Sequence, residues 1–111
     1  MTTPPEVDVE QWLPEITRRI IATAHPAAIW LFGSRAHGSS RPDSDVDLLV
    51  VLPHLSETRH AHAVALRTVL SDIPVPKDLL VTSIEEFDAK RDIWGTIPYE
   101  AAAYGRILYA A

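Results

Sequence analysis

Residues 32–52 read FGSRAHGSSRPDSDVDLLVVL, a turn of small residues followed by a group of acids and an apolar run. The apolar run predicts a buried strand over 45–52, because Val and Leu bounded by turn residues are typical of sheet interiors. Side chains alternate faces along a strand, so Asp45 and Asp47 point to the same side and Val46 to the other. The stretch therefore predicts two carboxylates side by side at the start of a buried strand.

These two carboxylates indicate a metal site. Like charges this close resist ionisation unless a cation lies between them. Carboxylate oxygens are the hard ligands that Mg²⁺ prefers, and two same-face carboxylates can bridge a pair of ions roughly 3.5–4 Å apart. Asp78 would complete the site if the apolar run at 77–82 forms a strand beside 45–52. A solvated strand entrance, with Asp78 as a plain strand-entry acid, is the alternative reading.

The turn before the acids indicates an anion site. Free backbone N–H groups at a strand-to-helix turn bind anions, and glycine lets a phosphate approach closely. Gly33 with the hydroxyl of Ser34 is therefore expected to hold phosphate groups. Arg35 and Arg41 are candidates for phosphate oxygens, since arginine suits bidentate contacts. Arg35 could equally belong to a surface ion pair.

The rest of the chain predicts helices alternating with short strands. Residues 1–8 are expected to be a leader and residues 9–111 a single domain, with Trp12, Trp30 and Trp94 in its core. Expected helices cover 9–24, 56–70, 83–93 and 99–104, the third opened by a capping box of Ser83 and Glu86, and expected strands cover 27–32, 45–52, 77–82 and 105–110. The predicted fold class is α+β, a small mixed β-sheet with helices packed on it.

Composition limits the partners and the compartment. The 111 residues include no cysteine, so any chemistry runs on oxygen and nitrogen groups. A net charge of −5 argues against extended nucleic-acid binding, which needs a basic footprint. The beginning of the chain carries acids and prolines rather than a secretory signal, and its apolar runs are short. A cytoplasmic protein without membrane contact is expected.

Gly33-Ser34, ten intervening residues, Asp45-Val46-Asp47 and the downstream acid Asp78 resemble the signature of the DNA polymerase β superfamily of nucleotidyltransferases. The chain length and the tail GTIPYEAAAYGRILY resemble its minimal nucleotidyltransferases, which are paired with HEPN-domain proteins in toxin–antitoxin systems. The resemblance implies the nucleotidyltransferase fold. Its members often have arginine after the GSRA sequence, where this chain has His37, which affects a phosphate or partner contact rather than the metal site.

The resemblance also implies roles for the residues. Asp45 and Asp47 would bind two Mg²⁺ ions, Asp78 the catalytic one, and Gly33 with Ser34 the phosphates of a nucleoside triphosphate, with ATP the expected substrate. The implied reaction moves AMP to a hydroxyl of a partner protein, expected to be a HEPN-domain toxin.

Two further readings stay open. The chain could be an antitoxin that neutralises a HEPN toxin by direct binding, without catalysis. It could also modify a small molecule, although such enzymes usually have a second domain for the acceptor. Three converging, mutually repelling carboxylates favour catalysis over simple binding.

Overall fold

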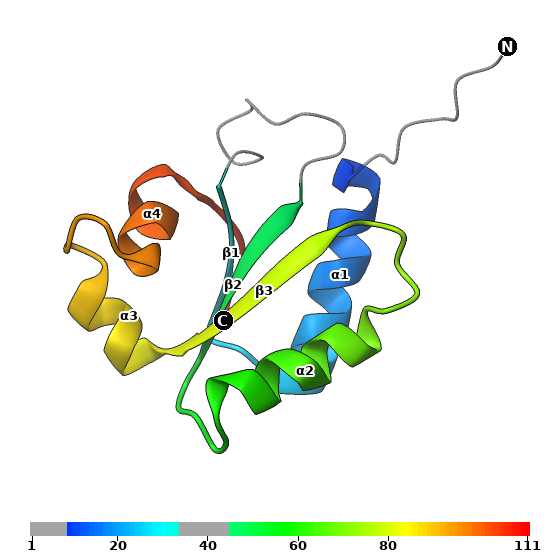
Figure 1. The fold of residues 1–111 in the computed structure, drawn as a ribbon, viewed down its shortest axis with the longest axis horizontal. Helices are drawn as coiled ribbons and strands as arrows, with labels where there is room; N and C mark the ends of the chain where they lie inside the picture. Colours follow the sequence, from blue (N-terminus) through cyan, green and yellow to red (C-terminus); the bar gives the residue numbers. More distant parts are fainter. Residues whose placement is uncertain (1–8, 34–44) are drawn as a thin grey trace, which may run out of the picture.

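The computed structural model of the protein describes residues 9–33 and 45–111. Figure 1 shows a central sheet with helices packed on both of its faces. In chain order the elements of the described residues are α1 Val9–Ala24, β1 Ala28–Phe32, β2 Val46–Leu52, α2 Arg59–Val69, β3 Lys77–Ser83, α3 Ile84–Lys90, α4 Ile97–Tyr104 and β4 Arg106–Ala110. The predicted α+β class is confirmed.

The strands of the described residues form one mixed sheet in the order β3, β2, β1, β4. β1 runs antiparallel to both β2 and β4, whereas β2 and β3 run parallel. Every residue of β2 except Asp47 is buried. Both faces of the sheet are covered, and β2 is therefore a nearly continuous apolar run rather than an alternating one.

Two apolar cores cover the two faces of the sheet. On one face, α1 and α2 pack through residues such as Ile16 and Leu66 against Leu48 and alternate β2 positions. On the other face, α3 and α4 contribute Phe87 and Ala101, which pack with Leu49 and the next alternate position. The alternation of the strand therefore directs Asp47 towards the side of α3 and α4.

The helix boundaries differ from the expected ones by a few residues. The helix expected over 56–70 begins after its N-cap Thr58, and the one expected over 83–93 ends at Lys90. Ser83 caps α3 as predicted, accepting a hydrogen bond from the Glu86 N–H at 3.2 Å. The Glu86 carboxylate binds Lys90 and Arg59 instead of completing a capping box. Within the described residues, no helix has both the length and the apolarity needed to cross a bilayer.

The prediction that all three tryptophans lie in the core is wrong for Trp94. Trp30 stacks on Phe87 with ring centroids 5.8 Å apart, and Trp12 packs against the first core. Trp94, in contrast, is 82% exposed. Because α3 ends at Lys90, Trp94 stands in the turn between α3 and α4, where it has no sheet face to cover.

Candidate active site at the entry of strands β2 and β3

The parallel pairing of β2 and β3 brings two of the predicted acids together. Asp47 and Asp78 are direct partners in the register of these strands, whose backbones lie about 4.8 Å apart in any sheet. Residues that are partners in register point to the same face. The strand adjacency that the three-acid prediction required is therefore present, and it places Asp78 beside Asp47.

Asp45 stands one residue before β2, since the strand begins at Val46 rather than at position 45. Its side chain is exposed. It is nevertheless close enough for its charge to act on Asp47. The structure thus gathers the three predicted acids at one end of the sheet, with Asp47 in the middle.

The electrostatics of Asp47 reflect this crowding. Burial raises the pKa of Asp47 above its ordinary value, and the negative charges of Asp78 and Asp45 raise it further. Both causes disfavour the ionised form, and a bound cation would reverse them. Perturbed acids of this kind cluster at functional sites.

Gly33, which follows the neighbouring strand β1, lies against the side chain of Asp47. The last residue of β1, Phe32, pairs with Asp47. The φ of Gly33, +76°, lies in the left-handed region that favours glycine. A Cβ at position 33 would collide with Oδ2 of Asp47 and come within 3.2 Å of its Cγ. Sequence reasoning assigned Gly33 to a phosphate, and this packing against a carboxylate has no local signal in the sequence.

The remaining predicted phosphate contacts fall outside the described residues. Ser34, Arg35 and Arg41 belong to the segment 34–44, as does His37. Their expected roles therefore stay predictions. Gly33 and the three acids are the part of the predicted site that the structure places.

Arg67 is a residue near the site that sequence reasoning missed. It stands on α2, and its Nη2 lies 3.6 Å from Oδ1 of Asp78. Both side chains are about half exposed, so the pair contributes little to stability. Nothing in the sequence links a helix residue to a strand acid eleven positions later. Only the way α2 packs beside β3 brings them together.

The carboxylate oxygens of Asp45, Asp47 and Asp78 are the candidate ligands for a divalent metal. In residues 9–33 and 45–111, no three His, Asp or Glu side chains come close enough together to form a ready three-ligand metal cluster. The pair Asp47 and Asp78, however, offers hard oxygen donors in register, and the charges of Asp78 and Asp45 raise the pKa of Asp47. This donor pair fits Mg²⁺, with Asp45 as the exposed third acid.

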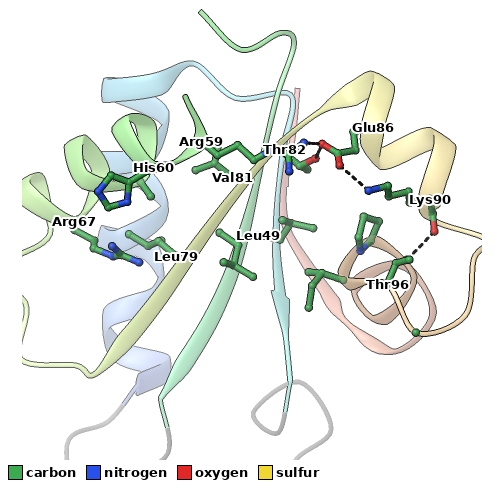
Figure 2. Close-up of a pocket in the computed structure, with 15 residues that line it drawn as sticks. Leu49, Arg59, His60, Arg67, Leu79, Val81, Thr82, Glu86, Lys90 and Thr96 are labelled. Atoms are coloured by element: carbon green, nitrogen blue, oxygen red, sulfur yellow. Dashed lines mark hydrogen bonds and ion pairs between the residues drawn. The ribbon is translucent and has the colours of Figure 1, made fainter. Parts of the chain in front are cut away.

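A groove of about 550 Å³ lies across β3. None of the three acids lines it, but Arg67, which contacts Asp78, does. The floor of the groove includes Leu49 and Leu80, each two residues beyond one of the paired acids on the same face. Figure 2 shows Arg59, His60 and Arg67 of α2 on one side and Lys90 of α3 with Thr96 on the other. Sequence reasoning did not find this groove, because it forms between distant elements.

A family model for the nucleotidyltransferase domain matches residues 12–98 of this chain. The match covers most of the chain and includes β1, β2 and β3 with Gly33 and the three acids. The protein therefore belongs to the family of nucleotidyltransferase domains. A comparison with curated proteins found no match.

Solved structures share the fold. A candidate nucleotidyltransferase from Sulfolobus solfataricus has a TM-score of 0.55 and 25% identity, over 72% of this chain and 74% of that chain. A toxin–antitoxin structure with AMP-PNP has a TM-score of 0.59 and 18% identity, over 89% of this chain and 73% of that chain. A variant of the toxin–antitoxin MntA-HpeT has a TM-score of 0.60, with the same identity and shares. At 18% identity, the last two establish likeness of fold alone.

Proposed function

We propose that the chain is a metal-dependent nucleotidyltransferase that moves AMP from ATP to a hydroxyl of a partner protein. The observation that supports this most directly is the register pairing of Asp47 with Asp78, next to the glycine turn at Gly33. A carboxylate pair beside a turn able to receive phosphates is what transfer of a nucleoside monophosphate requires.

The nucleotide is proposed to lie at the turn. Gly33 and Ser34 would receive its phosphates through backbone N–H groups and the serine hydroxyl, and Arg35 would bind non-bridging oxygens. The similar toxin–antitoxin structure that contains AMP-PNP supports an adenine nucleotide. ATP is therefore the substrate we propose.

The acids are proposed to hold two Mg²⁺ ions. Asp45 and Asp47 would bind both, and Asp78 the one nearer the acceptor. When bound, magnesium lowers the pKa of the acceptor hydroxyl and stabilises the charge on the departing pyrophosphate. The raised pKa of Asp47, caused by burial and then by its acidic neighbours, is the electrostatic situation that a divalent cation relieves.

The reaction balances without a further reagent. The acceptor oxygen forms a bond to the α-phosphorus of ATP while the bond between that phosphorus and the bridging oxygen to the β-phosphate breaks. Pyrophosphate leaves with that oxygen, and the hydroxyl proton passes to a carboxylate, for which Asp78 is the candidate. The role of the chain is to hold the acceptor oxygen in line with the α-phosphorus and the bridging oxygen that leaves.

The acceptor is proposed to be a HEPN-domain toxin, with this chain as its antitoxin. The resemblance to minimal nucleotidyltransferases supports this, and so does the likeness to an MntA-HpeT toxin–antitoxin structure. The net charge of −5 argues against a polynucleotide acceptor gripped along its backbone.

The test uses the protein encoded next to this chain in its genome. Both proteins are incubated with Mg²⁺ and ATP, and the neighbour is weighed by mass spectrometry. A gain of one or more AMP units, absent when EDTA replaces Mg²⁺ and absent with Asp47→Asn, supports the transferase. A neighbour that loses its toxicity without gaining mass supports the non-catalytic antitoxin instead.

A further inference from the structure

The groove across β3 carries a charge opposite to that of the chain. Three permanent cations line it, Arg59, Arg67 and Lys90, against one acid, Glu86. The whole chain has a net charge of −5. A locally basic groove on an acidic protein attracts anionic groups and excludes cationic ones.

Arg59 and Lys90 are held in place by a shared carboxylate and remain partly exposed. Glu86 binds both Arg59 of α2 and Lys90 of its own helix, so one carboxylate orients two cations from opposite sides of β3 (Figure 2). About half of the side-chain surface of Arg59, Arg67 and Lys90 stays exposed. All three are ion-paired, Arg59 and Lys90 with Glu86 and Arg67 with Asp78, but two cations share Glu86, so the lining keeps an excess of positive charge that is partly exposed to a ligand.

The floor and rim of the groove are apolar. Leu49 and Leu80 lie in the floor, and Ile97 stands in the wall with 39% of its surface exposed. Trp94, which immediately precedes the wall residue Gly95, is the most exposed large hydrophobic side chain in the described part of the chain. Exposed aromatic residues beside a groove are typical of protein-binding sites.

The groove comes near the proposed catalytic acids, since its lining residue Arg67 contacts Asp78. On β2, Leu49 follows Asp47 on the same face, and on β3, Leu80 follows Asp78 in the same way. Two residues along a strand correspond to roughly 6.6 Å. A segment bound over Leu49 and Leu80 therefore lies within a few residues of Asp47 and Asp78.

We propose that this groove docks an acidic, partly apolar segment of the acceptor protein and delivers the adjoining hydroxyl to Asp78. The inference rests on the proposed transferase function and identifies where its protein substrate binds. A polypeptide fits better than RNA, because the floor is apolar and Glu86 offsets part of the basic charge, whereas backbone-bound RNA needs a wholly basic track.

The experiment measures binding separately from catalysis. A short fluorescein-labelled peptide of alternating glutamate and leucine is titrated with the protein at low salt, and fluorescence anisotropy is recorded. A lysine–leucine peptide and a single-stranded oligoadenylate RNA are titrated in parallel. We expect the acidic peptide to bind more tightly than both, and we expect Mg²⁺-ATP not to displace it.

Two sets of variants locate the binding. Arg59→Gln with Lys90→Gln is expected to weaken the acidic peptide about tenfold, the equivalent of about 1.4 kcal/mol. The matched control is Arg18→Gln with Arg106→Gln, which removes two ion-paired cations elsewhere that are at least half exposed. If the groove pair proves unstable, Ile97→Glu at the wall serves instead, with the exposed Ile107→Glu on β4 as its control.

Several outcomes overturn the inference. Each of three results would show that the groove is not the docking site of the acceptor. These are equal weakening by the control variants, tighter binding of the RNA, and displacement of the peptide by Mg²⁺-ATP. Asp47→Asn keeps the two proposals apart, because it is expected to abolish transfer while leaving the peptide affinity unchanged. Transfer to the partner that persists in the groove variants with unaltered KM defeats the docking proposal and leaves the transferase standing.

Discussion

The α-carbon of Gly33 lies against the carboxylate of Asp47, so closely that any side chain at position 33 would collide with Oδ2 of that acid. The main chain after β1 therefore limits where the central acid can point. Gly95 offers a natural comparison. It has a φ of +88°, similar to the +76° of Gly33, but an added Cβ would meet nothing within 4 Å.

Gly33→Ala is expected to lower transfer by about 100-fold, because a displacement of about 1 Å at a reacting group has an effect of that size. Gly95→Ala is expected to reduce transfer far less, because its methyl group meets nothing within 4 Å, even though position 95 borders the acceptor groove. Both variants should lose about 1 kcal/mol of stability, since alanine is strained at a positive φ. The rate of partner modification and the thermal melting of both variants check this. Equal activity in the two variants would mean that the Gly33 contact does not position Asp47.

Asp47→Asn is expected to abolish transfer and to melt at or above the wild-type temperature at neutral pH. The pKa of Asp47 is raised by burial and then by Asp78 and Asp45, so its ionised form destabilises the fold. That destabilisation sets in as the pH rises above 3.8, the ordinary pKa of the group. The advantage of the variant should therefore shrink as the pH falls towards this value.

Asp72→Asn is the control for this pH dependence, because its charge has the opposite effect. A hydrogen bond from Arg19 holds the pKa of Asp72 below its ordinary value. Its ionised form therefore stabilises the fold, and Asp72→Asn should melt below wild type at neutral pH and approach it in acid. Parallel pH profiles for the two variants would contradict the assigned electrostatics of Asp47.

Glu15 is expected to contribute to stability above pH 4.5 and to lose that contribution in stronger acid. Hydrogen bonds from Arg18 and then Arg19 lower its pKa from 4.5 to about 2. A depressed carboxyl pKa stabilises the fold above the unfolded value and ceases to do so as the pH falls through the folded one. Melting of wild type and Glu15→Gln between pH 7 and pH 2 measures this. The difference should vanish near the acid end, and a constant difference would be evidence against it.

The elements that the sequence predicts correctly are those indicated by the spacing of apolar residues over short stretches. The apolar run after Asp47 has the length and composition of a buried strand, and the structure has β2 there with only its first boundary moved by one residue. Helix α1 matches the range expected from its apolar spacing, 9–24. These elements follow from the side chains of adjacent residues, which the sequence displays directly.

The parts that escaped prediction depend on contacts between distant segments. The approach of Gly33 to Asp47 comes from the antiparallel pairing of β1 and β2, and the Arg67 contact with Asp78 from the packing of α2 beside β3. Trp94 was expected in the core because large aromatic side chains are usually buried. Its exposure follows from the early end of α3.

Magnesium is expected to raise the melting temperature of the wild-type protein, because a cation bound at the Asp47 and Asp78 pair stabilises only the folded state. The gain would be about 2.7 kcal/mol when the ion is at about 100 times its dissociation constant. EDTA should reverse it. The double variant Asp47→Asn with Asp78→Asn should show no such rise, although it already lacks the repulsion between the two acids.

Asp88→Asn with Asp92→Asn is the matched control for this experiment, since both of these acids are exposed and the variant loses the same charge. It should keep the full response to Mg²⁺. Sodium chloride at equal ionic strength measures the screening of charge repulsion in each protein, and the magnesium effect is the rise beyond that sodium chloride control. A rise of the same size in all three proteins would mean that magnesium acts by screening, and that Asp47 and Asp78 do not bind it.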